Sequence, residues 1–590
     1  MKNQIALFVY ILLFTGCQQK DLIDISVNNE SGFVTININD PNVTEPLTLM
    51  PNQFGNLGCV FFWTDRDSFS LKGPPEIIRS NDQRFTGEWI LDGRIVSLNF
   101  SKSEIGYEFI FNAQPNDNIM GWGVQIAASE DEYFTGLFER VVDGNQSESW
   151  KEGLETALNL RGQSVDMLIK PTLGLYCPFY LSSNGYGLFI EGTWPGHYDV
   201  CNEYEDLVQV HFEGPSLGGT IYTSNEPSEI VKTHAVNVGP TIIPPKWAFL
   251  PYRWRDNNAN YKHYYDGSPV HSPFNSTLTE DILMMKAYDI PCGVYWIDRP
   301  WAKGPMGYDD FEWDRQKFPN HKKMISWLED QDIRLLLWIA PWVDGNMADT
   351  ARKRNYMIPG KNNAWAMEHE LALIDFTNNA AKEWWQKEGL AKVLNDGIKG
   401  FKMDRSEELV PETRDIVFAN GKTAREMRND YPVHYVKAAN EICRKIHGDD
   451  FLLFPRAGYT GSSKYSAFWG GDIGSPPEGL RAAIIAAQRS AIIGYPLWGA
   501  DIGGYWHGAM DREVTARWLA FGCFNPIMEF GPTRNKGPWN MATEPAYDTS
   551  LIATWRLYAK IHENMADYSH KLAVEANGTQ IGLSNKICLL

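Results

Sequence analysis

The chain has 590 residues and a formal net charge of −19, from 54 Lys and Arg against 73 Asp and Glu. This length predicts roughly two to four domains. The negative charge argues against nucleic acid or an anionic membrane surface as the main partner, because both bind surfaces rich in Lys and Arg.

The N-terminus is typical of a secretory signal peptide over residues 1–16. Lys2 supplies the positive charge, and the apolar run that follows is too short to span a bilayer. Small residues lead into Cys17, and this junction resembles a bacterial lipobox, in which the cysteine is lipidated. We expect a lipid-anchored protein of the periplasm, outer membrane or cell surface. The alternative is ordinary cleavage beside a chance cysteine.

Residues 17–30 are polar, and we interpret them as a tether after the anchor. From 31 to 240, short runs of alternating apolar and polar residues are separated by Gly, Asn, Asp and Pro, which is typical of strands and turns. This pattern predicts an N-terminal β-sandwich. Candidate strands cover residues 32–38, 94–100, 186–191 and 219–223.

From 241 to 575, apolar strands alternate with amphipathic helices, which indicates a parallel sheet. The repeats predict an α/β fold, a closed (β/α)8 TIM barrel, with an insertion after the third strand near 343–372. Residues 576–590 remain an unassigned tail. Candidate strands cover 293–298, 333–340, 400–404, 450–455, 467–470 and 496–501, and candidate helices cover 322–330, 379–395 and 478–493.

Two of these strands end in an aspartate. Asp404 closes the run Gly-Phe-Lys-Met-Asp, and Asp472 closes Phe-Trp-Gly-Gly-Asp. Carboxylates at the C-terminal ends of different barrel strands meet at the face where active sites of this fold lie. One can attack a sugar while the other protonates the leaving oxygen. Lys402 favours an ionised Asp404, whereas Trp469 predicts drier surroundings and a protonated Asp472.

Over nearly its whole length the chain resembles glycoside hydrolase family 31. The resemblance rests on the order of motifs at 133–139, 178–187, 244–248, 297–301, 311–319, 337–341 and 498–504, together with the two aspartate motifs. It implies a galactose-mutarotase-like sandwich before the barrel, and α-glycosidase activity without metal or organic cofactor.

By this resemblance Asp404 is the nucleophile and Asp472 the general acid/base. Charged side chains can hold sugar hydroxyls and indoles can stack under the ring, although an internal salt bridge or packing role is the alternative for each. Glu407 and Glu408 are expected to order the loop of Asp404. The implied substrate-binding residues are Asp298, Trp338, Lys402, Arg456, Trp469 and Asp501.

The chain departs from the family at two places. Many relatives end the eighth strand with Met-Arg-x-His, whereas here the run is Pro-Ile-Met-Glu-Phe-Gly over 526–531. This difference weakens the expectation of an α-glucoside, and Glu529, Arg534 or Asn535 are candidate substitutes for the missing sugar contact. Relatives also continue into C-terminal β-domains, which we expect to be missing here.

Seven cysteines follow Cys17, without a C-x-x-C pair or zinc-ligand spacing. We expect mostly buried thiols and no metal site, and a disulfide between Cys177 and Cys201 stays open.

These observations predict a retaining, exo-acting α-glycosidase that acts on glycans or oligosaccharides outside the cytoplasm. Galactose, xylose and an N-acetylhexosamine are as open as glucose, and the oligomeric state is open too. Alternatives are a transglycosylase or lyase on the same scaffold, or a non-catalytic, lipid-anchored carbohydrate-binding protein.

Overall fold

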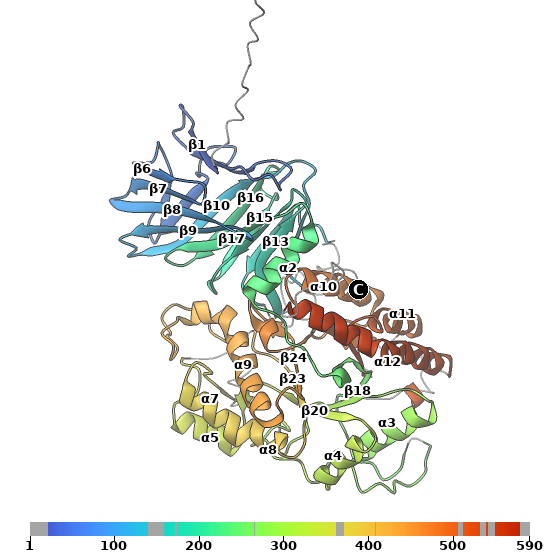
Figure 1. Cartoon of the computed structure of the whole chain (residues 1–590). Helices are drawn as coiled ribbons and strands as arrows, with labels where there is room; N and C mark the ends of the chain where they lie inside the picture. The colour runs from blue at the N-terminus through green and yellow to red at the C-terminus, as the bar shows by residue number, and fades with distance from the viewer. Residues whose placement is uncertain are drawn as a thin grey trace, which may run out of the picture.

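The computed structural model describes residues 22–139, 158–170, 174–264, 266–360, 371–407, 409–505, 511–531, 538–540 and 549–578. Figure 1 shows a β-domain packed on one end of a barrel domain, with α2 and α10 near the junction. The expected signal peptide and Cys17 lie outside the described residues, as do 579–590 of the tail.

The β-domain consists of two antiparallel sheets, each with nine strands in the described residues. The first follows the path β1–β2–β3–β10–β16–β15–β12, with β4 and β5 attached through β10. Its strands are β1 (Ile23–Val27), β2 (Val34–Ile38), β3 (Leu47–Leu49), β4 (Val60–Thr64), β5 (Ser68–Ser70), β10 (Ile119–Ala127), β12 (Gln163–Met167), β15 (Gly196–Val200) and β16 (Leu207–Glu213).

The second sheet follows the path β11–β13–β14–β17–β9–β8–β7–β6, and β25 joins it beside β13. Its strands are β6 (Ile77–Ser80), β7 (Arg84–Leu91), β8 (Arg94–Ser103), β9 (Gly106–Gln114), β11 (Phe134–Phe138), β13 (Gly174–Ser182), β14 (Tyr186–Ile190), β17 (Leu217–Thr223) and β25 (Ala457–Gly458).

Alternation along the strands explains why these sheets pack face to face. In β2, Val34, Ile36 and Ile38 are buried while Thr35 and Asn37 between them are more exposed. One face of each strand therefore enters the shared core and the other meets solvent.

The second domain is a barrel of parallel strands. Neighbouring strands are hydrogen-bonded in the order β24–β23–β20–β19–β18–β28–β27–β26. The seam between β24 and β26 is bridged where the N–H of Ala467 donates to the carbonyl of Leu453. Most strand residues are buried, as in other parallel sheets covered by helices. The strands are β18 (Tyr252–Arg255), β19 (Val294–Ile297), β20 (Arg334–Ile339), β23 (Gly400–Met403), β24 (Leu452–Pro455), β26 (Phe468–Trp469), β27 (Trp498–Ile502) and β28 (Ile527–Phe530).

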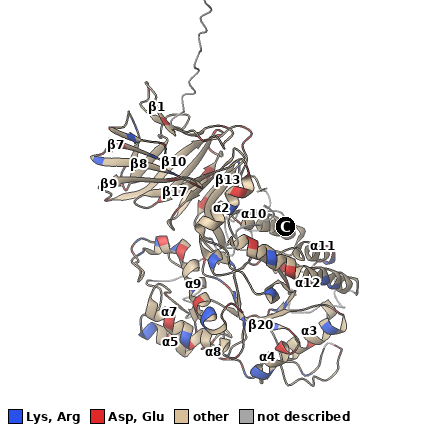
Figure 2. Cartoon of the chain, in the orientation of Figure 1, with Lys and Arg blue, Asp and Glu red and all other residues tan. Residues whose placement is uncertain are grey.

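Helices surround this barrel, as Figure 1 shows. They are α3 (Ser276–Ala287), α4 (His321–Glu329), α5 (Asn346–Lys353), α7 (Asn379–Trp385), α8 (Ala391–Leu394), α9 (Ala424–His447), α10 (Pro477–Ile492), α11 (Arg512–Gly522) and α12 (Thr549–Asn577), after α2 (Pro227–Val238) between the domains. A π-helical turn, Gln386–Leu390, joins α7 to α8. Figure 2 shows both signs of charge along α5, α9 and α12.

The structure confirms the predicted β-sandwich and (β/α)8 barrel. After the third barrel strand, α5 and the short pair β21 (Trp342–Val343) and β22 (Ala372–Leu373) occupy the region of the expected insertion. The tether predicted over residues 17–30 extends too far toward the C-terminus. Residues 23–27 form strand β1 on β2, because Ile23 alternates with polar neighbours and is buried in the sandwich.

Cys177 and Cys201 are both buried free thiols, so the disulfide that the sequence left undecided does not form. Within the described ranges, no helix has the length and apolar composition needed to cross a membrane.

Candidate active site

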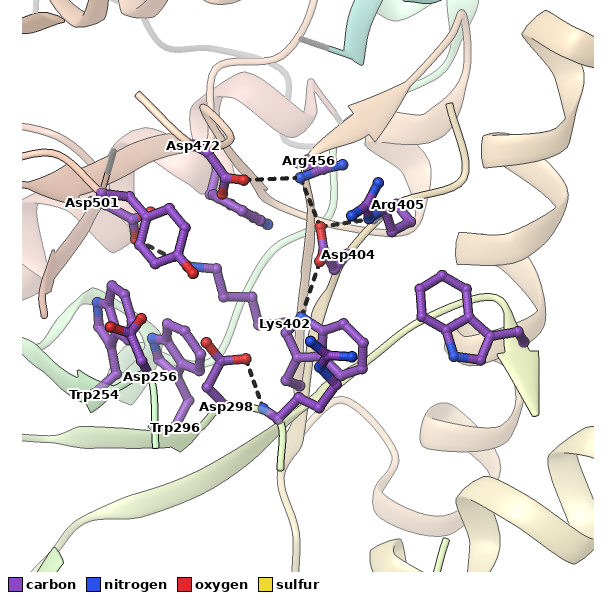
Figure 3. Close-up of a pocket in the computed structure, with 15 residues that line it drawn as sticks. Trp254, Asp256, Trp296, Asp298, Lys402, Asp404, Arg405, Arg456, Asp472 and Asp501 are labelled. Carbon is purple, nitrogen blue, oxygen red and sulfur yellow. Dashed lines mark hydrogen bonds and ion pairs between the residues drawn. The ribbon is translucent and has the colours of Figure 1, made fainter. Parts of the chain in front are cut away.

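A pocket of about 420 Å³ opens at the C-terminal ends of the barrel strands. Its volume lies near the lower end of the about 300–1,000 Å³ that is usual for small-molecule sites. Figure 3 shows its polar side chains converging from several strands. The lining residues are Trp254, Asp256, Trp296, Asp298, Arg299, Trp338, Trp342, Lys402, Asp404, Arg405, Arg456, Trp469, Asp472, Asp501 and Tyr505.

Asp404 follows β23 directly and is held at both of its carboxylate oxygens. Oδ1 accepts from the backbone N–H of Arg405 at 2.8 Å, and Oδ2 accepts from the Trp338 indole N–H at 3.2 Å. The backbone continues in an unusual way, because Arg405 and Ser406 both have positive φ angles, 63° and 95°. Such conformations cost about 1–3 kcal/mol each and occur where a chain must aim a functional side chain.

Arg456 connects the two candidate catalytic aspartates. Its Nη1 lies 3.0 Å from Oδ1 of Asp404 and 3.5 Å from Oδ2 of Asp472. These oxygens are therefore no farther apart than the two distances combined. The arginine therefore holds the two carboxyl groups near each other at one face of the barrel, as two carboxylates that flank one glycosidic bond must be.

Glu407 fixes the orientation of Arg456. Its Oε1 accepts from Arg456 Nε at 2.8 Å, and both side chains are almost fully buried. Glu407 therefore positions the arginine that contacts both aspartates, whereas Glu408 lies outside the described residues.

The same surroundings separate the pKa values of the two aspartates. Burial acts to raise the pKa of Asp404, but Arg456, Arg405, the backbone N–H of Arg405 and Lys402 together hold it below its usual value. For Asp472 burial is the dominant effect and raises the pKa, against the opposing charge of Arg456 and with a further rise from Asp404. The two pKa values are therefore shifted in opposite directions, in the sense that a nucleophile and a general acid require.

Lys402 forms the floor of the pocket. Its Nζ lies 3.0 Å from Oδ1 of Asp501 and 3.2 Å from Oε2 of Glu529, and each of these side chains is at most 3% exposed. The ammonium also lies 3.8 Å from the ring centroid of Trp469 and 4.1 Å from that of Trp296. Aromatic faces attract such a cation, so its position is fixed from several sides.

Burial raises the pKa of Asp501 well above its usual value and also raises that of Glu529, while Lys402 opposes both shifts. Burial would lower the pKa of Lys402, but the two carboxylates outweigh it and raise that pKa. A single ammonium is therefore shared by two buried carboxyl groups.

The surroundings of Gly531 leave no room for the histidine that many relatives carry at this position. A Cβ on Gly531 would overlap the indole of Trp254. Trp254 stacks on Trp296 with ring centroids 4.4 Å apart and an interplanar angle of 20°. The indole thus fills the space that a side chain at 531 would need, while Arg534 and Asn535 lie outside the described residues.

The N-terminal domain also contributes to the position of the site. Strand β25 begins at Ala457, directly after Arg456, and pairs in parallel with β13 through Gly174. Any side chain at 174 would collide with Ala457. Trp498 at the start of β27 donates its indole N–H to Glu139 of the β-domain at 3.2 Å. The β-domain therefore holds two segments of the barrel near the pocket.

The structure brings most of the predicted site residues to one pocket. Glu529 is the correction: it is fully buried beneath Lys402 and Trp296 and does not line the pocket, so it supports these side chains rather than binding sugar. Asp298, Trp338, Lys402, Asp404, Arg456, Trp469, Asp472 and Asp501 all line it.

The pocket also has lining residues that the sequence did not lead us to predict: Trp254, Asp256, Trp296, Arg299, Trp342 and Tyr505. A signal for Asp256 was present, because Trp254-Arg-Asp256 repeats the Trp-x-Asp pattern of Trp296-Ile-Asp298. Within the described residues, no group of His, Cys, Asp and Glu side chains has an arrangement suited to a metal ion.

Comparison with known proteins identifies the family. A model described as the glycosyl hydrolases family 31 TIM-barrel domain matches residues 243–572, more than half of the chain. The chain belongs to glycosyl hydrolase family 31. An alpha-xylosidase of Emericella nidulans is 27% identical over 70% of this chain and 51% of that protein. A sulfoquinovosidase of Agrobacterium fabrum is 28% identical over 70% of this chain and 61% of that protein.

Solved structures share the fold. A family 31 sulfoquinovosidase from E. rectale matches with a TM-score of 0.72 at 18% identity, over 94% of this chain and 85% of that one. The cycloalternan-forming enzyme of Listeria monocytogenes matches with a TM-score of 0.68 at 19% identity, over 95% and 56%. The family 31 chain described here spans about half the length of the curated relatives that it matches.

Proposed function

We propose that this family 31 protein is a retaining, exo-acting α-glycosidase that removes a terminal sugar through a covalent glycosyl-enzyme intermediate. The observation that carries the proposal is the Asp404–Arg456–Asp472 arrangement, in which one arginine nitrogen contacts both carboxylates. The pKa of Asp404 is lowered and that of Asp472 is raised, which are the directions that a nucleophile and a general acid need.

In the first step the ionised Asp404 attacks the anomeric carbon of the bound sugar. Asp472 gives its proton to the glycosidic oxygen, and the bond between this oxygen and the anomeric carbon breaks as the bond to Asp404 forms. Trp338 and the backbone N–H of Arg405 hold the attacking carboxylate in place through its two oxygens.

In the second step Asp472, now ionised, takes a proton from water, and the hydroxide equivalent attacks the same carbon. The bond to Asp404 breaks, and the sugar leaves with its original anomeric configuration. A sugar hydroxyl in place of water would give transglycosylation from the same intermediate, and one similar protein is named an isomaltosyltransferase.

Exo action is supported by the floor of the pocket. Lys402, with Asp501 and Glu529 beneath it, and the stacked Trp254 and Trp296 close the inner end. A chain end can enter such a pocket, whereas the middle of a glycan cannot pass through it. The filled space above Gly531 supports a sugar contact pattern different from that of the family's α-glucosidases.

The test is trapping of the intermediate. A panel of aryl α-glycosides identifies the sugar that is hydrolysed, and the matching 5-fluoro glycosyl fluoride is then used as a slow substrate. Peptide mass spectrometry should find the sugar on Asp404, and not on Asp472. Azide should restore turnover of Asp472→Ala on an activated substrate and give the retained glycosyl azide. Wild-type product of inverted configuration would contradict the proposal.

A further inference from the structure

The pocket contains a repeated Trp-x-Asp pattern on two neighbouring strands, and the proposed reaction steps use only part of it. Trp254 and Trp296 lie in register in β18 and β19, and Arg255 pairs with Ile297. Asp256 and Asp298 are the next residues along each strand. Neighbouring strands lie about 4.8 Å apart, so the two aspartates start from adjacent points of the barrel rim.

Both aspartates face the pocket from the same wall. Asp256 and Asp298 line the cavity, and Figure 3 shows them over Trp254 and Trp296, away from Asp472. The wall holds two carboxyl groups close together: burial, followed by the charge of Asp256, raises the pKa of Asp298 well above its usual value. Burial and then these two carboxyl groups also raise the pKa of Tyr505.

The position of this wall determines which part of a sugar it faces. The anomeric carbon must lie at Asp404, and the leaving oxygen must lie at Asp472. Asp256 and Asp298 are on the other side of the pocket, so they face the ring carbons farthest from the anomeric centre and the substituents there. Hydroxyl groups at these positions can donate to carboxylate oxygens, and such charge-assisted bonds are strong.

An anionic substituent would meet a different environment at this wall. Arg456 is engaged by Asp404, Asp472 and Glu407, and Lys402 is engaged by carboxylates below the floor. Arg299, which also lines the pocket, has its guanidinium 5.8 Å from the Trp338 ring centroid. A sugar carboxylate or sulfonate at the wall would therefore be repelled by the charge of Asp256 at low dielectric.

We propose that Asp256, acting with Asp298, is a specificity-determining residue that binds hydroxyl groups at the far end of the terminal sugar and excludes sugars carrying an anionic group there. This inference rests on the proposed glycosidase function and specifies its substrate class as neutral sugars. Asp256→Asn keeps the size of the side chain and removes its charge, so it separates recognition from packing.

The experiment compares three 4-nitrophenyl α-glycosides: the neutral hexoside that the wild type hydrolyses fastest, its 6-deoxy analogue and its uronide. The wild type should favour the hexoside over the uronide by at least about 100-fold. In Asp256→Asn, kcat/KM on the hexoside should fall about 10- to 100-fold, the effect of one hydrogen bond to a charged group. The ratio of kcat/KM on the hexoside to kcat/KM on the uronide should fall at least about tenfold, because the variant no longer carries the repulsive charge.

Two further variants serve as controls. Asp256→Glu keeps the charge, so it should lose rate on the hexoside and still reject the uronide. Asp309→Asn removes another aspartate whose pKa is raised, to about 6, by burial and neighbouring acids. Asp309 does not line the pocket, and this variant should keep the wild-type rates on all three substrates.

A titration that needs no turnover completes the test. Free neutral hexose and the matching uronic acid are added to the wild type, and the quenching of tryptophan fluorescence gives their dissociation constants. The hexose should bind at least about tenfold more tightly than the uronic acid, because the uronic acid loses a hydrogen bond to the wall and is repelled by its charge.

The outcomes separate the two proposals. Hydrolysis of the hexoside with an unchanged ratio in Asp256→Asn would overturn the role of Asp256 and leave the glycosidase function in place. If no aryl α-glycoside were hydrolysed, the proposed function would fail, and the titration would still decide the preference of the wall. Tighter binding of the uronic acid would overturn this inference in either case.

Discussion

Replacing Lys402 with methionine removes the ammonium that two buried carboxyl groups share. Methionine has a similar length and fits among the aromatic rings, so the main change is electrostatic. Asp501 and Glu529 would remain buried beside each other without their cation, with side chains at most 2% exposed in the wild type. Breaking a buried ion pair by removing one partner costs about 3–5 kcal/mol.

The loss can be measured by thermal and urea unfolding. At about 2 °C per kcal/mol for a large domain, the barrel transition of Lys402→Met should fall by about 6–10 °C. Lys399→Met is a matched control on the same segment of chain. Its partner Asp450 lies 2.7 Å away but is 48% exposed, so this ion pair contributes no more than about 1 kcal/mol.

The pH dependence gives a second check with a definite sign. Without Lys402 the pKa values of Asp501 and Glu529 in the folded state rise further above their unfolded values. Groups with raised folded pKa values stabilise the fold at low pH, and this contribution is lost as the pH rises through the folded pKa. The deficit of Lys402→Met should therefore be smaller at pH 5 than at pH 8. Equal stability of Lys402→Met and Lys399→Met at both pH values would refute the electrostatic role of the Lys402 ammonium.

Three further predictions concern activity. The pH profile of kcat/KM should be bell-shaped. Its acid limb should lie below the usual aspartate range because the pKa of Asp404 is lowered, and its alkaline limb above that range because the pKa of Asp472 is raised. A single limb in direct rate measurements would contradict these roles. Gly531→His should give an unstable, inactive protein rather than an α-glucosidase, because the new side chain overlaps Trp254; a folded variant by circular dichroism with wild-type kcat/KM would disprove this. Gly174→Val should reduce kcat by at least about tenfold, because the new side chain collides with Ala457, the neighbour of Arg456, where β13 pairs with β25. Unchanged kcat in a folded variant would show that the β-domain does not position the arginine.

The sequence alone determined the two domains and the main catalytic candidates. Alternating apolar residues such as Val34, Ile36 and Ile38 can be buried on one side only in a sheet, and this local pattern is independent of distant contacts. Asp404 and Asp472 each follow an apolar strand, and parallel strands of a barrel end at the same face. Chain order and strand period were therefore sufficient to predict that these carboxylates meet.

Only the tertiary structure decided how the pocket is built around them. Arg456 contacts both aspartates because the closing barrel places β24 and β26 side by side, and no local pattern encodes that distance. Glu529 shares the strand-end position of a sugar ligand, yet the register of β28 places it under Lys402 instead. The alignment of Asp256 with Asp298 likewise depends on the pairing of β18 with β19, since a shift by one residue would turn either side chain away from the pocket.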